Sequence, residues 1–180
     1  MTRINLTSYV KENYGDGAEI ARQAVGRVVP LRQADYGGEQ DCTLTSIVTL
    51  YRGDKEAEDF YAEVEGAAKT YFYAPNRGTP FLFICPIINK ATGLKSSFRF
   101  FKHIGFGWQK IKSLINEQKP FILSMRNDGR DYYKNHSVSV VGYIEYDNGA
   151  KMLMIYDNWY RGITYIDYNK LSFISGINYI

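Results

Sequence analysis

Two residue types that are rare in this sequence, cysteine and histidine, stand where nucleophilic chemistry would need them. The chain has two of each; Cys42 opens an apolar helical pattern, and His136 opens an alternating apolar strand. A polar pair, Asp157 and Asn158, ends another apolar strand. Cysteine, histidine and a carboxylate or amide, each at the end of an element, are the parts of a thiol nucleophile with its base and an orienting group.

Cys42 is the candidate nucleophile. It follows Asp41, a residue type that favours helix N-caps, and it lies off the apolar stripe of its own helix. The free N–H groups and the dipole of a helix N-terminus favour a thiolate, so this position lowers the pKa of a thiol. The alternative is a buried cysteine that only packs. Cys85, in an apolar stretch, is expected to be such a buried residue, and a disulfide is not needed at this chain length.

His136 is the candidate general base, because a histidine held at a rigid strand start can present one ring nitrogen to a thiol. Its alternative is a polar residue that merely begins a strand. The rival histidine, His103, lies in the segment 100–105, which predicts a loop or strand end with no evident partner.

The third member of the set follows from a predicted hairpin. Asp147-Asn148-Gly149 is a tight-turn sequence, so the strands on either side of it are expected to run antiparallel. The end of the later strand then returns to the level of His136. Asp157 lies there and can accept a hydrogen bond from the second ring nitrogen, which fixes the tautomer. Asn158 is the competing orienting residue.

Hydrolysis through a thiol also needs donors for the oxyanion. The backbone N–H of Cys42 is one, and a side-chain amide from upstream would be the other. Gln33 and Gln40 are both available, and each has the alternative of a solvated loop glutamine.

The elements that position these residues indicate an α+β fold in one domain. Helical patterns come first and an antiparallel sheet follows. We expect residues 1–28 to form a helical N-terminal extension, in which Asp16 and Glu19 are spaced as a capping box. Further helices are expected over 42–51, 54–71 and 108–118, strands over 121–125, 137–146, 151–156 and 163–168, and an irregular segment over 74–104.

The composition excludes several classes of function. Of 180 residues, 45% are hydrophobic and 23% are charged, as in folded globular proteins. The net charge of +3 is spread without a dense basic run, which argues against nucleic-acid binding. No apolar run reaches the length of a membrane span, and no signal peptide is visible. The cysteines and histidines have no metal-ligand spacing, so neither a metal nor another cofactor is expected.

The ordered set of motifs resembles the papain-like cysteine peptidases, and among them the bacterial staphopain and bacteriocin-leader-peptidase branch. Val29–Gln33 resembles the entry strand with its oxyanion glutamine, and Asp41-Cys42 resembles the catalytic cysteine at the head of the central helix. Lys119–Leu123 followed by His136–Tyr143 resembles the strand pair that carries the catalytic histidine. Tyr156–Trp159 resembles the segment of the third residue, which is an asparagine in some members and an aspartate in others.

This resemblance implies a papain-like fold, with the Cys42 helix packed on a C-terminal antiparallel sheet. It also implies a peptide or protein substrate and suggests secretion from a bacterium. Thr43 stands where the family usually has a small residue or glycine, and the longer interval from Gln33 to Cys42 keeps Gln40 as the alternative. The interval from Cys42 to His136 is shorter than the about 130 residues of larger relatives, which predicts a shorter groove.

Three other functions share these residue types. Cell-wall endopeptidases of the NlpC type also begin a helix with Asp-Cys, and transglutaminase-like acyl transferases use cysteine, histidine and a carboxylate. A binding module that kept the fold without its activity is the non-enzymatic alternative. The sequence does not identify the substrate, the cleavage preference, the oligomeric state or the role of residues 1–28.

Overall fold

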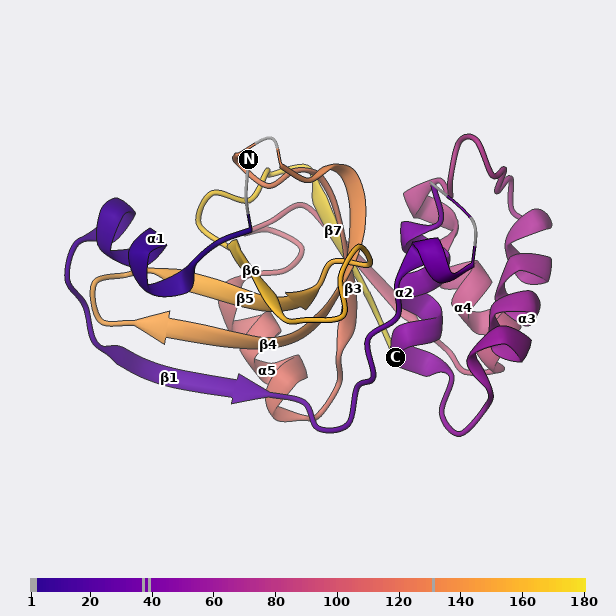
Figure 1. Cartoon of the computed structure of the whole chain (residues 1–180), viewed down its shortest axis with the longest axis horizontal. Helices are drawn as coiled ribbons and strands as arrows, with labels where there is room; N and C mark the ends of the chain where they lie inside the picture. The colour runs from indigo at the N-terminus through magenta and orange to yellow at the C-terminus, as the bar shows by residue number, and fades with distance from the viewer. Residues whose placement is uncertain (1–2, 37, 39, 131) are drawn as a thin grey trace.

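The structure is a computed structural model that describes residues 3–36, 38, 40–130 and 132–180. Helices α2, α3 and α4 gather at one end of the molecule, and most of the antiparallel sheet lies beside them (Figure 1). The helices are α1 (Leu6–Tyr14), α2 (Cys42–Tyr51), α3 (Ala57–Lys69), α4 (Ile84–Thr92) and α5 (Trp108–Asn116), with short 3-10 turns at Gln33–Asp35 and Phe81–Phe83. The strands are β1 (Glu19–Ala24), β2 (Ser97–Phe100), β3 (Phe121–Asn127), β4 (Lys134–Tyr146), β5 (Lys151–Tyr156), β6 (Thr164–Asp167) and β7 (Ser175–Tyr179).

The sheet is built around β4. Its strand order is β2-β7-β3-β4-β5-β6, and β1 also pairs with β4. The first half of β4 pairs with β3 and its second half with β1, while β5 lies along its other edge. The expected hairpin at residues 147–149 joins β4 to β5, and Gly149 adopts a φ of 87° there, which favours glycine. The antiparallel pairing brings the end of β5 back toward the start of β4.

An irregularity in β4 changes which side chains share a face. Strict alternation places Val141 and Tyr143 together, but Tyr143 packs in the same cluster as Val138 and Val140. The cause is a register shift between Val140 and Gly142, since a bulge moves the following residues to the opposite face. A Cβ on Gly142 would lie 2.6 Å from the carbonyl oxygen of Gln23, so only glycine fits this close pairing with β1.

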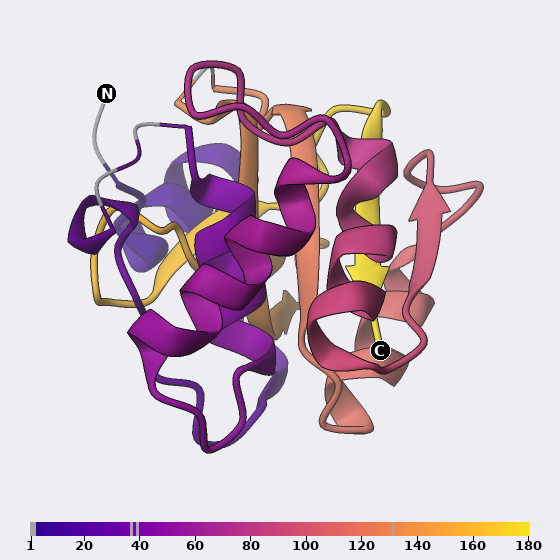
Figure 2. The same ribbon diagram turned by 90° about the vertical axis from the view of Figure 1, so that its right-hand side faces the viewer.

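Apolar side chains from both faces of the sheet are buried. One cluster joins α5 to Phe121 and Leu123 of β3, and a second joins α2, α3 and α4 to Ile122. Because side chains of a strand alternate, α5 and the three helices cover opposite faces. Figure 2 shows α2, α3 and α4 in front of the sheet. A third cluster packs α1 against β4 and β5.

The helical expectation for residues 1–28 is wrong over part of its length. Residues 6–14 are helical, but Glu19–Ala24 form the strand β1, and the helix N-cap is Asn5 rather than Asp16. Glu19 instead forms an ion pair with Arg22 at 2.7 Å. Pairing with β4 satisfies the main chain of this segment, and that long-range contact outweighs a helical spacing of small apolar residues.

The segment 74–104, which was expected to be irregular, contains α4 and β2. Pro86 lies in the first turn of α4, where the missing N–H is not needed. The strand β7 near the C-terminus was also not predicted. The helices expected over 42–51, 54–71 and 108–118 and the strands of the sheet are present, with small shifts of their ends.

Candidate active site

Cys42 is the first residue of α2 and is partly buried. Its thiol lines one cleft together with His136, and the pKa of the thiol responds to His136, to Thr43 and to the backbone of Ser137. Burial raises the pKa of the Cys42 thiol, but the hydrogen bond and charge of His136 lower it, and the net direction is downward. The structure therefore brings together the two residues that sequence reasoning paired.

His136 lies near the start of β4 and is almost fully buried. Its ring stacks on that of Tyr133, with centroids 5.5 Å apart and planes 7° from parallel. The ring of Trp159 is also in contact, with centroids 4.5 Å apart and planes tilted by 31°. Burial lowers the pKa of His136, but the hydrogen bond and charge of Cys42 raise it more, and the net direction is upward. Tyr133 and Trp159 also contact each other, with centroids 5.2 Å apart, so the three rings form one aromatic cluster.

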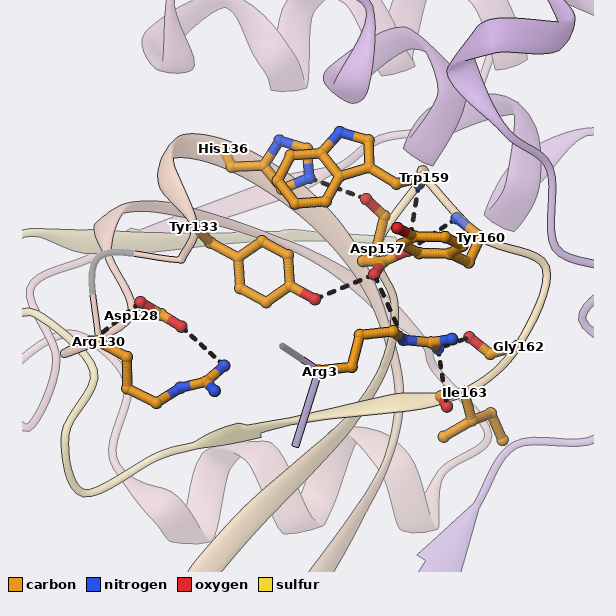
Figure 3. A network of polar contacts seen from close by, with 10 residues as sticks. All are labelled: Arg3, Asp128, Arg130, Tyr133, His136, Asp157, Trp159, Tyr160, Gly162 and Ile163. Atoms are coloured by element: carbon orange, nitrogen blue, oxygen red, sulfur yellow. Dashed lines mark hydrogen bonds and ion pairs between the residues drawn. The ribbon is translucent and has the colours of Figure 1, made fainter. Parts of the chain in front are cut away.

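The main chain of Asp157, not its carboxylate, contacts the imidazole. Nε2 of His136 lies 2.8 Å from the carbonyl oxygen of Asp157, and Figure 3 shows the carboxylate directed away from the ring. Oδ2 accepts from the Tyr133 hydroxyl at 3.0 Å, and Oδ1 accepts the N–H groups of Trp159 and Tyr160. Asp157 thus lies where the hairpin predicted, but its side chain holds the turn that presents its carbonyl.

Arg3 reaches this turn from the N-terminal segment (Figure 3). Its guanidinium donates to the carbonyl oxygens of Gly162 and Ile163 at 2.7 and 3.0 Å. Nε lies 3.9 Å from Oδ2 of Asp157, which is an ion pair without a hydrogen bond. The charge of the buried carboxylate is thus partly balanced.

Asp128 shapes the loop that carries Tyr133. Its Oδ1 accepts the N–H groups of Arg130 and Tyr132, and its Oδ2 pairs with the Arg130 guanidinium at 3.1 Å. Figure 3 places this pair on the far side of Tyr133 from Asp157.

Asn158 does not contact His136. Its Nδ2 lies 2.8 Å from each of three acceptors, namely the carbonyl oxygens of Cys42 and Ser137 and Oγ of Ser46. An amide nitrogen has two hydrogens, so one of them is shared. Asn158 therefore fastens the head of α2 to β4, and its φ of 65° is one that asparagine tolerates better than most residues.

Asp41 occupies the N-cap position of α2, as expected, but its side chain makes no capping hydrogen bond. Its carboxylate accepts the hydroxyls of Tyr61 and Tyr73 at 2.6 and 2.5 Å. The carboxylate is buried, and it fixes the residue before Cys42 against α3 and the segment after it. The position was predictable, but the two tyrosines were not.

A row of hydroxyl groups joins α2 to the sheet. Thr43 Oγ1 donates to Ser137 Oγ at 3.0 Å, and Ser137 Oγ lies 2.9 Å from Ser124 Oγ. Thr43, which departs from the small residue of the resembled family, thus has a polar role that a glycine would lack.

The two glutamines lie differently. Gln33 is partly buried with its side-chain oxygen buried, and its main-chain N–H donates to the carbonyl oxygen of Asn158 at 2.8 Å. Gln40 is exposed, and it lines the cleft that contains Cys42. Gln33 is therefore tied to the residue that holds Cys42, whereas Gln40, and not Gln33, is among the described residues that line the cleft with Cys42.

A cleft of about 380 Å³ opens beside the Cys42 and His136 pair. Residues 77–81 come from the helical side, and Ser124, Met125 and Arg126 come from β3. Phe100, Ile174 and Gly176 complete its apolar part. Cys42, Thr43 and His136 are among the residues that line this cleft.

The remaining cysteine and histidine lie elsewhere. Cys85 Sγ is 3.2 Å from Oδ1 of Asn178, and burial raises the pKa of its thiol. His103 contacts Tyr168 at 3.4 Å. Within the described parts of the chain, no group of side chains could hold a metal ion, and no helix is long and apolar enough to cross a bilayer.

Sequence reasoning missed the aromatic residues around His136. Trp159 was part of the matched segment without a role, and Tyr133 lies three residues before the histidine. The available signal was an aromatic residue close in sequence to His136 and another close to Asp157. With 16 tyrosines in the chain, such a neighbour did not stand out.

Comparison with known proteins decides the fold. No family model matches the chain, and neither does any curated protein. Among solved structures, the crystal structure of UfSP from C. elegans superposes with a TM-score of 0.60 at 12% identity. The match covers 88% of this chain and 33% of the neighbour, so the chain spans about a third of that protein's length.

The fold is papain-like. At 12% identity the likeness concerns the fold alone, and it does not distinguish the staphopain branch from other branches.

Proposed function

We propose that this papain-like domain is a cysteine peptidase in which Cys42 is the nucleophile and His136 the general base and acid. The observation that carries the proposal is that Cys42, at the head of α2, and His136 line the same cleft, where each shifts the pKa of the other: that of Cys42 is lowered and that of His136 is raised. These opposite shifts favour a thiolate and imidazolium pair, the reactive form of a thiol peptidase.

The main-chain carbonyl of Asp157 fixes the imidazole. A carbonyl oxygen only accepts, so Nε2 must carry a proton, and Nδ1 is left to face the thiol. The flat faces of Tyr133 and Trp159 limit rotation of the ring. Asp157 is thus a positioning residue, and its carboxylate acts by holding the turn.

The reaction follows from this arrangement. The Cys42 thiolate attacks the carbonyl carbon of the scissile peptide bond, and the oxyanion that forms is held by the backbone N–H of Cys42 and a glutamine amide, for which we favour Gln33 over Gln40. The carbon–nitrogen bond then breaks as His136 gives its proton to the leaving amine. Neutral His136 next takes a proton from water, which hydrolyses the thioester and releases the acid.

Three alternatives predict different products. An NlpC-type endopeptidase would cleave purified peptidoglycan, a transglutaminase-like enzyme would transfer the acyl group to an added amine, and a binding module would bind peptide without turnover.

The test is incubation with a mixed peptide library, with product identification by mass spectrometry, alongside labelling by an epoxide inhibitor of thiol peptidases. We expect cleaved peptides and a label on Cys42, and neither in Cys42→Ala. Acyl transfer to an added amine in preference to hydrolysis would replace the proposal with the transferase.

A further inference from the structure

The cleft beside Cys42 carries positive charge on two of its walls. Arg77 lies in the segment after α3, and Arg126 lies on β3. Both are exposed, and both line the cleft. The described residues that line it include no aspartate or glutamate. The exposed charged side chains among the described residues that line the cleft are therefore both positive.

Neither arginine has an ion-pair partner among the described residues, in contrast to several arginines elsewhere. Arg22, Arg32 and Arg161 each pair with a carboxylate at 2.6–3.1 Å. The guanidinium groups of Arg77 and Arg126 thus remain available to a carboxylate that enters the cleft, and guanidinium groups bind carboxylates in a planar, two-pronged geometry.

A row of phenylalanines continues the cleft on one side. Phe81 and Phe100 line the cleft and stack on each other with centroids 5.1 Å apart. The ring centroids of Phe100 and Phe101 are 4.2 Å apart, and those of Phe101 and Phe173 are 5.1 Å apart. Phe81, Phe101 and Phe173 are each 39–47% exposed. An exposed apolar surface that continues from a cleft is typical of a binding site.

We propose that the cleft selects peptide segments in which an acidic residue stands near an apolar one, with Arg77 and Arg126 holding the carboxylate and the phenylalanine row holding the apolar side chain. This inference rests on the proposed peptidase function, because it describes the substrates of the same site. It follows from charge complementarity and from the continuity of the apolar surface with the cleft.

The test compares the wild type with Arg77→Glu/Arg126→Glu. A matched control, Lys95→Glu/Arg99→Glu, changes the net charge equally at exposed positions outside the cleft. Matched peptides carry Glu, Gln or Lys beside a leucine. We expect kcat/KM of the wild type to fall from Glu to Lys. The cleft variant should lose about five- to tenfold on the Glu peptide, the size expected for two exposed ion pairs, while the control keeps its preference.

The apolar half is tested by Phe81→Ser with peptides in which the leucine is replaced by serine. The wild type should prefer leucine, and the variant should lose most of that preference. Raising salt from about 0.15 M to 1 M should weaken the charge preference but not the apolar one, because screening shortens the Debye length from about 8 Å to 3 Å.

Binding to Cys42→Ala, followed by fluorescence anisotropy with the same peptides, separates this inference from the proposed function. If the peptides bind with the expected preference but the wild type does not cleave them, the proposed peptidase function is wrong and the proposed selectivity of the cleft stands. Cleavage without preference between Glu and Lys peptides, or an equal loss in the control variant, would overturn the selectivity. If the peptides are neither bound nor cleaved, both the proposed function and the selectivity are overturned.

Discussion

Nε2 of His136 lies 2.8 Å from the main-chain carbonyl oxygen of Asp157, while the carboxylate of the same residue accepts hydrogen bonds from Tyr133 and from the main chain. The orienting contact thus does not depend directly on the chemistry of the residue-157 side chain. Substitution of an orienting carboxylate normally removes both the acceptor for the imidazole and the hydrogen bonds that hold the surrounding turn. Here a substitution at residue 157 removes only the second, because the acceptor belongs to the main chain.

Asp157→Asn should therefore be mild. Asparagine retains an oxygen for the N–H groups of Trp159 and Tyr160, and the carbonyl that contacts His136 is unchanged. We expect kcat to fall about tenfold, against the about 10⁴-fold loss that the same change causes when a carboxylate contacts the imidazole directly. Steady-state kinetics on a cleaved peptide decides between these values. A loss of kcat of about 10⁴-fold would indicate that the carboxylate contacts the imidazole during catalysis.

Tyr133→Phe tests the support beneath the imidazole. The ring that stacks on His136 stays, but the hydroxyl that donates to Asp157 at 3.0 Å is lost, and a buried acceptor loses a partner. We expect the free energy of unfolding to fall by about 1–2 kcal/mol, with a several-fold loss in kcat.

Tyr132→Phe is the matched control, since Tyr132 is the neighbouring tyrosine and makes its ring contacts with Tyr133 and Trp159. Equal effects of the two substitutions, measured by urea unfolding and by kinetics, would show that the Tyr133 hydroxyl has no special part.

Asn158→Gly should destabilise the junction of α2 with the sheet. Glycine accepts the positive φ without strain, so the change isolates the amide that serves Cys42, Ser46 and Ser137. Buried carbonyl oxygens lose their donor, and we expect about 2–3 kcal/mol lower stability in urea unfolding. Asn76→Gly, at an exposed loop position, should change stability by about 0.5 kcal/mol or less. A similar small change for Asn158 would contradict its clamping role.

The two glutamines are separated by paired substitutions. Gln33→Ala should lower kcat by about 100–1,000-fold if its amide is the oxyanion donor. Gln40→Ala should then cost less, although Gln40 lines the cleft with Cys42, because an exposed side chain is held less firmly in the position that an oxyanion donor needs. KM should change little for Gln33, since the donor acts on the transition state. The opposite order of losses would move the role to Gln40 and leave the thiol chemistry as proposed.

Much of this site was predictable because it rests on local signals. A helix beginning at Cys42 follows from apolar spacing, and the level of Asp157 relative to His136 follows from the turn at residues 147–149. The sequence could not show which atom of Asp157 faces the ring, because residue type does not distinguish a carboxylate contact from a carbonyl contact.

The errors in the fold have a different origin. Glu19–Ala24 form β1 because β4 supplies a partner far away in the sequence. The edge strand β2 and the last strand β7 pair with each other, and Gly176 lies so close to the Phe98 ring that a Cβ there would come within 2.7 Å. Such long-range pairings leave little trace in the periodicity of a short segment.

The most direct test of the proposed thiolate and imidazolium pair is the pH dependence of alkylation at each cysteine, followed by mass spectrometry after brief iodoacetamide treatment. Because the pKa of Cys42 is lowered, its thiolate should persist at pH values where an ordinary thiol, with a pKa of about 8.5, is protonated. Cys85, whose pKa is raised, should react slowly throughout. His136→Gln should move the Cys42 profile to higher pH. Faster labelling of Cys85, or a Cys42 profile that His136→Gln leaves unchanged, would contradict the pair.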